Sequence, residues 1–280
     1  MLLARIHVAA TYNYLGAVAE RIGGDRVKVT VLASPKYDPH FVVPKPSLIP
    51  ALRRADMLIV NGAGLEIGWL PPLIRRANNG KIEPGRPGFV DASRAVETID
   101  RSANVSRAYG DVHPEGNPHY NLDPHNIVPV AMLIARRLQR IDPAHKADYE
   151  RNLERFLQRW RAFLERFDAQ MRPCEGMKVV QYHELFNYLL RRYGIESVGT
   201  IEPLPGIAPS SKHTMELIAR MRRERVGTIL QDIYHEKKTA QFIAAKTGAR
   251  VVVLPHDLGA VPGSGTLESF YETIAKRLCP

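Results

Sequence analysis

The sequence predicts an α/β fold of two Rossmann-like lobes, each with a roughly four-stranded parallel sheet, joined by one long helix. Three observations support this prediction. Short apolar β-rich runs alternate with helix-like stretches, as they do where helices cover a parallel sheet. The runs form two sets of four, and the gap between the sets holds the longest helical periodicity in the chain. The length of 280 residues also suits about two domains at roughly 150 residues each.

The predicted strands fall on both sides of this gap. In chain order they are Ile6–Ala9, Val27–Val31, Met57–Val60, Gly88–Asp91, Lys178–Gln181, Ser197–Ile201, Thr228–Gln231 and Val251–Leu254. No sequence repeat relates the first four runs to the last four. The similarity that we expect between the two lobes is therefore one of architecture alone.

The gap contains apolar residues at a regular helical spacing. They are Tyr149, Leu153, Phe156, Leu157, Trp160, Phe163, Leu164, Phe167 and Met171. Intervals of three and four residues place them on one face of a helix with a period of 3.6 residues. We interpret this stripe as core and assign it no role in binding a cofactor.

Signals at both ends delimit this helix. Asp142 and Pro143 are an N-cap and a first helical residue, and Pro173 marks the end. A helix over about 143–172 would be roughly 45 Å long at 1.5 Å per residue, which is longer than one small lobe needs. The expected division is an N-terminal lobe over 1–141, a connecting helix over 142–172 and a C-terminal lobe over 173–280.

Composition excludes several classes of protein. The chain is 45% hydrophobic and 24% charged, and its apolar runs fall far short of the ~20 residues that span a bilayer. A membrane channel and a disordered chain are therefore excluded. The net charge of +10 raises nucleic acid as a partner. However, on the polar face of the helix predicted within 136–172 no aromatic residues alternate with the basic ones, so we expect a solvated basic surface and no nucleic-acid partner.

The two cysteines and the N-terminus bear on the cellular compartment. Cys174 and Cys279 cannot form a zinc-finger framework; they can pair in an oxidising compartment or stay free. Arg5 interrupts the apolar start of the sequence, and no cleavage site follows it, so this start does not resemble a signal peptide. It fits a cytosolic protein or an exported one whose signal has been removed.

Four of the ten histidines occupy positions where an α/β sheet binds ligands. His40, His183 and His256 each follow a predicted strand, and His119 lies in a loop that prolines make rigid. Neutral imidazoles suit Zn²⁺ and other borderline transition ions, whereas Ca²⁺ and Mg²⁺ prefer oxygen ligands. The pattern therefore predicts a transition-metal site.

Common catalytic motifs are missing from the sequence. The glycines of Gly62–Gly68 are one residue out of step with a dinucleotide loop, so we interpret this segment as a helix entry. His183-Glu184 begins like a zinc-protease motif, but Asn187 stands where the second histidine is needed. Neither G-x-S-x-G nor G-K-[ST] occurs, so the sequence indicates neither a serine hydrolase nor nucleotide hydrolysis.

Several short motifs together resemble one known family. They are Asp38-Pro39-His40 with Pro46-Ser47, Ala55-Asp56, Asn61-Gly62, Gly64-Leu65-Glu66, Trp69-Leu70, Asn117-Pro118-His119, Leu122-Asp123-Pro124, Tyr182-His183-Glu184-Leu185-Phe186-Asn187-Tyr188, Tyr193-Gly194 and Lys246-Thr247-Gly248-Ala249. In this order they resemble the zinc- and manganese-binding solute-binding proteins of ABC importers (cluster A-I), zinc type, over essentially the whole chain. The resemblance implies two lobes joined by a long helix, with one metal ion between them.

The same resemblance implies the metal ligands. Three ligand positions of the family fall on His40, His119 and His183. Manganese-selective members usually have Glu at the third position, so a histidine there favours zinc, although Mn²⁺ or Fe²⁺ stays possible. At the fourth position the family has an Asp three residues before a Gly, where this chain has His256, followed by Asp257. We expect His256 as the fourth ligand, with Asp257 or an open position as the alternatives.

Other residues have secondary roles in this hypothesis. Asp232 or Glu202 can support the ligands as nearby carboxylates. His113 is either an auxiliary ligand or an incidental histidine in a surface loop, and His125 is either a residue at a helix start or a support for the ligands. The remaining histidines are expected to be structural or on the surface, namely His7, His145, His213 and His235.

The resulting functional prediction is a binding protein and not an enzyme. It captures a divalent transition metal, with Zn²⁺ favoured, and delivers it to an ABC importer whose permease and ATPase are separate chains. We expect a monomer in the periplasm or at the outer face of the membrane. Two alternatives stay open: a metal-dependent hydrolase, for which Glu184 is the candidate base, and a binder of a metal chelate such as a siderophore.

Overall fold

The structure is a computed structural model that describes residues 5–101, 113–204 and 206–280. The chain divides into two compact units. Unit 1 comprises Met1–Thr98 and Pro124–Leu164, and unit 2 comprises Ile99–Asp123 and Glu165–Pro280. Each unit is therefore built from two separate stretches of the chain.

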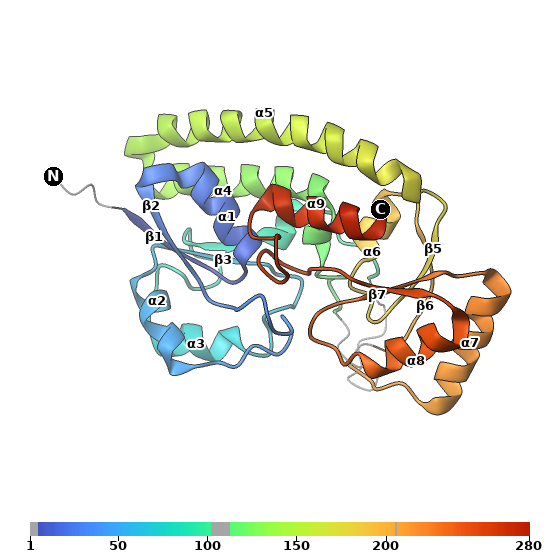
Figure 1. The fold of residues 1–280 in the computed structure, drawn as a ribbon. Coiled ribbons are helices and arrows are strands. Elements are labelled where there is room, and N and C mark those ends of the chain that lie inside the picture. The colour runs from blue at the N-terminus through green and yellow to red at the C-terminus, as the bar shows by residue number, and fades with distance from the viewer. Residues whose placement is uncertain (1–4, 102–112, 205) are drawn as a thin grey trace. The chain divides into compact units, whose positions relative to one another are not determined.

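Unit 1 is organised around a four-stranded parallel sheet. Its strands are β1 (Ile6–Ala10), β2 (Val27–Val31), β3 (Met57–Val60) and β4 (Phe89–Asp91), in the order β2-β1-β3-β4. Its complete helices are α1 (Asn13–Gly23), α2 (Ile49–Arg54), α3 (Leu70–Ala77) and α4 (Ile127–Ile141). Helices α1 and α4 pack together on one face of the sheet, and α2 and α3 pack together on the other (Figure 1). Strand β3 is buried at every position because helices cover both faces.

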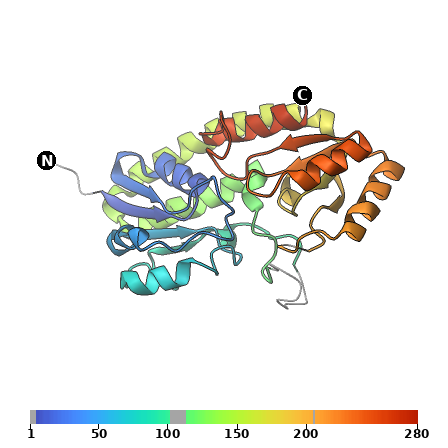
Figure 2. The same ribbon diagram turned by 60° about the horizontal axis from the view of Figure 1, so that its bottom comes forward.

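Unit 2 repeats this arrangement with a different sequence. Its strands are β5 (Lys178–Gln181), β6 (Glu196–Thr200), β7 (Thr228–Gln231) and β8 (Arg250–Val253), all parallel, in the order β6-β5-β7-β8. Its complete helices are α6 (Asn187–Arg192), α7 (Ser211–Glu224), α8 (Lys238–Thr247) and α9 (Leu267–Leu278), shown from a second side in Figure 2. Leu217, Ile218 and Met221 of α7 and Ile243 of α8 pack with Val180 of β5 in one apolar core.

Helix α5 (Lys146–Met171) runs from unit 1 into unit 2, with the division after Leu164. It confirms the predicted long helix, but it begins three residues later than predicted, because Pro143–His145 forms a 3-10 turn. The Asp142 carboxylate does not cap the helix; it accepts hydrogen bonds from His145 and Tyr149. Of the predicted stripe, seven residues are buried, and Leu153 and Leu157 are half-buried.

Within the part of the chain that the structure describes, the remaining helical segments are single 3-10 turns. They are Gly24–Arg26, Pro46–Leu48, Ala92–Ala95, Tyr120–Leu122, Pro124–Asn126, Pro143–His145 and Arg172–Cys174. His125 lies in the turn that leads directly into α4, the helix-start position predicted as one of its two roles. Within the described residues, no helix is long and apolar enough to cross a membrane.

The structure confirms the predicted fold class and all eight strands, whose ends differ from the predicted ones by one residue at most. It also decides the state of the cysteines, because Cys174 and Cys279 form a disulfide within unit 2. In each sheet the first strand is central, with the second strand on one side and the third on the other. Ligands of such sheets bind outside the carboxyl ends of the strands, where the strand order reverses.

Candidate metal site

His40 lies in the loop between β2 and α2 of unit 1, and local hydrogen bonds fix its ring. Asp38 Oδ1 accepts hydrogen bonds from the backbone N–H of His40 at 2.9 Å and from its ring Nδ1 at 2.8 Å. Pro39 anchors the loop, because its carbonyl oxygen accepts a hydrogen bond from the buried Tyr12 hydroxyl. A carboxylate can only accept, so Nδ1 carries the proton and Nε2 carries the lone pair that a metal ion needs.

A buried carboxylate shapes the neighbouring loop of unit 1, which follows β3. Glu66 accepts hydrogen bonds from the Thr11 hydroxyl at 2.7 Å and from the backbone N–H groups of Asn61 and Gly62 at 2.6 and 3.1 Å. Burial raises the pKa of Glu66 to about 7, although these hydrogen bonds oppose the shift. The turn requires glycine at Gly62, which has a φ of +80° and where a Cβ would lie 1.9 Å from Asp91.

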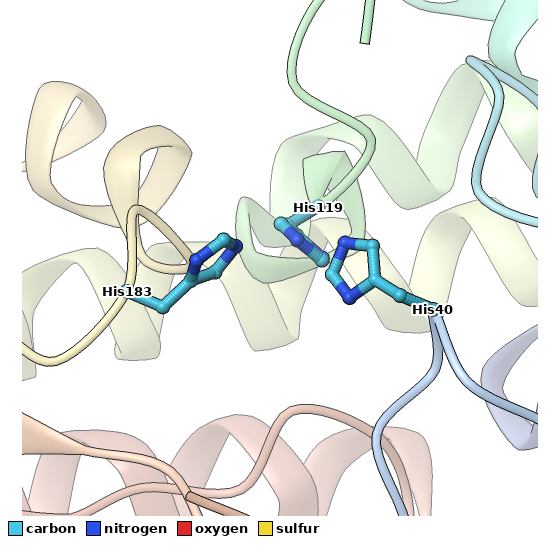
Figure 3. Close-up of side chains that lie close together, drawn as sticks. All are labelled: His40, His119 and His183. Atoms are coloured by element: carbon cyan, nitrogen blue, oxygen red, sulfur yellow. The ribbon is translucent and has the colours of Figure 1, made fainter. Parts of the chain in front are cut away.

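His119 and His183 come together within unit 2. Their rings are 5.7 Å apart between centroids and nearly perpendicular. Figure 3 shows the two side chains, which come from different loops. Asn117 ties the two loops together: its side chain accepts from the His119 backbone N–H and donates to the Glu184 carbonyl. Tyr188 of α6 donates in turn to the Asn117 carbonyl. Both histidines are buried, so this pair is a fixed feature of the unit.

A chain of three further residues supports His183. Its Nδ1 lies 3.0 Å from Glu202 Oε2, and the second oxygen of Glu202 lies 3.2 Å from His235 Nε2. The other ring nitrogen of His235 lies 2.7 Å from Asp232 Oδ2. The four residues follow the carboxyl ends of three neighbouring strands, namely β5, β6 and β7.

The charges in this chain are set by hydrogen bonding. Burial disfavours ionisation of Glu202, but the hydrogen bonds from His183 and His235 outweigh it and lower the pKa of Glu202 to about 2. Burial likewise disfavours the charged form of His235, yet its bonds to Asp232 and Glu202 raise the pKa of His235 to about 10. At neutral pH, Glu202 is therefore a carboxylate and His235 is an imidazolium ion.

The chain as a whole matches a known family. The sequence model of the family described as zinc-uptake complex component A, periplasmic (ZnuA), matches residues 8–278. The chain belongs to the ZnuA family. A crystal structure of ZnuA superposes with a TM-score of 0.79 and 25% identity over 98% of this chain and 99% of that one.

Curated relatives are similar over most of their length. The high-affinity zinc uptake system protein ZnuA of Bacillus subtilis (strain 168) is 23% identical, with 89% of this chain and 78% of the relative covered. The manganese ABC transporter substrate-binding lipoprotein PsaA of Streptococcus pneumoniae is 25% identical, with 80% and 71% covered. The ZnuA family fold has thus been retained at low sequence identity.

The two candidates for the fourth ligand of this ZnuA-family chain have different surroundings. His256 is buried, its ring contacts that of Tyr234 at 5.0 Å, and its carbonyl accepts from Asn121 at 2.9 Å. Asp257 is also buried, and its carboxylate accepts the backbone N–H of Leu258 at 2.8 Å. The Asp257 carboxylate therefore takes part in a local turn, and the assignment of the fourth ligand stays a prediction.

The other predicted residues are located as follows. Glu184 has an exposed side chain beside a cavity of about 80 Å³, which His183, Thr200 and Glu202 also line. His113 is half-buried, and its carbonyl accepts from the Gly116 N–H. Positions 110–112 of the same loop lie outside the described residues, and the role of His113 stays a prediction.

One residue that lies beside these histidines was not singled out by the sequence analysis. His235 was expected to be structural or on the surface, but it connects Glu202 to Asp232 beside a predicted ligand. Its sequence signal was present: it follows β7 by four positions, at the same kind of strand end that singled out His183. Glu202, one of two carboxylates suggested as supports, is the one that contacts His183 directly.

Proposed function

We propose that this protein captures a divalent transition metal, with Zn²⁺ preferred, and delivers it to an ABC importer. The carboxylate partner on Nδ1 of His183 is the observation that carries the proposal. A ligating histidine typically donates its other ring nitrogen to a carboxylate, which fixes the tautomer and makes the ligand more basic. His40 has the same kind of partner in Asp38, so each unit contains one proposed ligand whose ring is oriented by a carboxylate.

The proposed ligands are His40, His119 and His183, each of which can offer one ring nitrogen. We propose His256 as the fourth ligand, with Asp257 or an open position as the alternatives and His113 as an auxiliary ligand. A nitrogen-rich set favours Zn²⁺ over Mn²⁺, because Mn²⁺ gains less from imidazole than from carboxylate. Four neutral histidines would leave the 2+ charge of the ion uncompensated, which makes the nearby Glu202 carboxylate useful.

The proposed partner is the permease of an ABC importer with a separate ATPase. Relatives are named as ABC transporter substrate-binding lipoproteins, and the family description is periplasmic. The Cys174–Cys279 disulfide supports an oxidising compartment, since such bonds are rare in the cytosol. We therefore propose that a monomer works in the periplasm or at the outer face of the membrane.

A binding role is favoured over the two alternatives. The cavity beside His183 is about 80 Å³, far below the roughly 300–1,000 Å³ of pockets that enclose drug-sized ligands, so a metal chelate is disfavoured. A hydrolase needs an open metal position with a general base beside it. Glu184 is the candidate base, and hydrolysis that is lost in Glu184→Gln would support an enzyme instead.

Equilibrium dialysis of metal-stripped protein with Zn²⁺, Mn²⁺ and Fe²⁺ tests the proposal. We expect one equivalent of Zn²⁺ to bind, more tightly than Mn²⁺, and the affinity to fall at acidic pH because protonated histidines cannot ligate. The double variant His40→Ala, His183→Ala should abolish this binding. His145→Ala is the control, because His145 pairs with Asp142 at the start of α5. Unchanged binding in the double variant would refute the proposed ligand set.

The fourth ligand can be tested separately. We expect His256→Ala to weaken Zn²⁺ binding more than Asp257→Ala, measured by competition with a chelating dye. The reverse order would assign the position to Asp257. Equal and negligible losses would indicate an open position that water fills.

A further inference from the structure

His235 bridges two carboxylates with a single imidazole ring. Nδ1 is 2.7 Å from Asp232 Oδ2, and Nε2 is 3.2 Å from Glu202 Oε1. Since ionised carboxylates only accept hydrogen bonds, both ring nitrogens must donate. The ring therefore holds the two acidic side chains at a fixed separation.

Packing fixes the position of this ring. It stacks on Tyr182, with 4.4 Å between centroids and 19° between planes, and contacts Tyr234 at 4.7 Å. Asp232 is completely buried, and its Oδ1 accepts the backbone N–H groups of Tyr234 and His235 at 2.9 and 2.8 Å. The loop after β7 thus holds both Asp232 and the ring of His235.

The carboxylate of Glu202 is held through both of its oxygens. His235 engages Oε1, while His183 engages Oε2, which the backbone N–H of Gly206 also approaches at 3.3 Å. A carboxylate held at one oxygen only can rotate about its terminal bond. The bond from His235 removes this freedom, so Oε2 stays directed at His183 Nδ1.

We infer that His235 is a positioning residue for metal capture: it holds Glu202 so that Glu202 fixes the His183 ring with Nε2 directed toward the metal ion. The inference rests on the proposed function, because it assumes that His183 is a metal ligand. The geometry supports it, since a ring with a carboxylate oxygen beside each nitrogen donates at both. The three charges sum to −1, which favours a cation beside His183.

The chain contains a matched pair for comparison. His145 and Asp142 also lie three residues apart, and their Nδ1 and Oδ2 atoms are likewise 2.7 Å apart. This pair lies in unit 1 at the start of α5, where Asp142 also accepts from Tyr149 and not from a proposed ligand. Substitution of His145 therefore measures the loss of a histidine–aspartate pair that has no connection to a metal ligand.

The test compares Zn²⁺ affinity and the tautomer of His183 in the wild-type protein and three variants. His235→Phe keeps an aromatic ring for Tyr182 and removes both donors, and His235→Gln keeps one donor. His145→Gln is the control. We expect His235→Phe to lower Zn²⁺ affinity by about 10- to 100-fold, the typical loss for a residue that supports a metal ligand, with His235→Gln intermediate and the control unchanged.

Long-range ¹H–¹⁵N spectra of the metal-free proteins report the tautomer of His183. Wild type and His145→Gln should show a proton on Nδ1, and His235→Phe should show a mixture of tautomers. If His235→Phe does not fold, Zn²⁺ affinity and the tautomer of His183 are measured in His235→Gln and Asp232→Asn instead. An unchanged tautomer, or an unchanged Zn²⁺ affinity, would overturn the inference.

These readings separate the inference from the proposed function. Wild-type protein that fails to bind Zn²⁺ refutes the proposed function, whereas the spectra of the metal-free variants still show whether His235 fixes His183. Wild-type binding with an unaffected His235→Phe variant refutes the inference alone.

Discussion

The two units each bury a glutamate in the loops at the carboxyl ends of their strands, with opposite consequences for its pKa. Burial raises the pKa of Glu66 in unit 1 to about 7. Glu202 in unit 2 is also buried, yet its hydrogen bonds to two histidines lower its pKa to about 2. Glu66 receives only neutral donors, from Thr11 and the backbone, whereas Glu202 faces the His235 cation. The hydrogen bonds from two histidines thus outweigh burial at Glu202, whereas those from Thr11 and the backbone do not outweigh it at Glu66.

The two units also differ in how a carboxylate supports the proposed ligand of each, His40 in unit 1 and His183 in unit 2. Asp38 lies two residues before His40 and keeps 22% of its side chain exposed. Glu202 lies 19 residues after His183 and keeps 7% exposed. Unit 1 therefore supports its ligand through one local turn, and unit 2 supports its ligand through tertiary structure. Perturbations of unit 2 should consequently affect metal binding more strongly.

The largest expected difference in stability between the units comes from the disulfide. Cys174–Cys279 spans 105 residues of unit 2, while unit 1 contains no cysteine. Closing a loop of this length stabilises the folded state by about 4 kcal/mol, through lost entropy of the unfolded chain. We expect Cys174→Ser, Cys279→Ser to lower the free energy of unfolding by about this amount, measured by urea titration. Hydrogen exchange should show the loss in unit 2; an equal loss of protection in β1 and β3 would contradict this assignment.

The next effect is the pH dependence that Glu66 gives to unit 1. Its pKa is about 7 in the folded protein against 4.5 ordinarily, so the folded state binds more protons between these values. Stability should therefore fall as pH rises from about 4.5 to 8, by about 3 kcal/mol from this group. In Glu66→Gln this contribution is missing. Urea titrations of metal-free protein across this range should give curves that diverge as pH rises, and parallel curves would contradict the prediction.

Unit 2 should show a different dependence of stability on pH. Glu202 has a folded pKa below its ordinary 4.5, so its contribution is present above pH 4.5 and is lost as pH falls toward 2. His235 has a folded pKa above its ordinary 6.5, so its contribution is complete below pH 6.5 and is lost as pH rises toward 10. The network therefore stabilises unit 2 most between about pH 4.5 and 6.5, and His235→Phe should lose most stability in that window.

The fold could be predicted from the sequence because its signals are local. The strands are apolar runs of three to five residues, and the stripe of α5 repeats along a single helix. The error at the start of α5 has a local cause that the sequence pattern did not reveal. The Asp142 carboxylate had three possible hydrogen-bond donors, namely the helix N-terminus, His145 and Tyr149. In the structure it accepts from His145 and Tyr149 and not from the helix N-terminus.

The candidate site was only partly predictable. Strand-end position and family resemblance together identified His40, His119, His183 and His256, because each histidine can be recognised by itself in its own motif. The Glu202–His235 contact joins loops that are 33 residues apart and depends on the neighbouring order of β6, β5 and β7. Strand order is not written in any single motif, so the position of His235 after a predicted strand did not by itself indicate its contact with Glu202.

A smaller effect is expected on Zn²⁺ affinity when each of the two supporting carboxylates is replaced in turn. Glu202→Gln removes a buried charge that fixes His183, and Asp38→Asn removes a more exposed charge beside His40. We expect a loss of Zn²⁺ affinity of about 10- to 100-fold for Glu202→Gln and a smaller loss for Asp38→Asn. Competition dialysis at pH 7 measures both. An equal loss in the two variants would show that local and tertiary supports are equivalent.

The smallest effect concerns the ends of helices. Helices α1 to α4 of unit 1 have no side-chain cap at the N-terminus, whereas in unit 2 Ser210 caps α7 and Thr266 caps α9. The Thr266 hydroxyl oxygen accepts a hydrogen bond from the Ser269 backbone N–H, and the Ser269 hydroxyl oxygen accepts one from the Thr266 backbone N–H. Thr266→Ala should cost about 1 kcal/mol in the free energy of unfolding.

Helix α9 is connected to the loop of His119, because the hydroxyl of Tyr271 in this helix donates a hydrogen bond to the Asn121 carbonyl, two residues after His119. Thr266→Ser keeps the capping oxygen and is the matched control, which should retain wild-type stability. A Thr266→Ala variant as stable as wild type would mean that α9 is held by its buried face alone. Zn²⁺ affinity should remain unchanged in both variants, since Phe270 and Ile274 keep the helix packed even when its first turn frays.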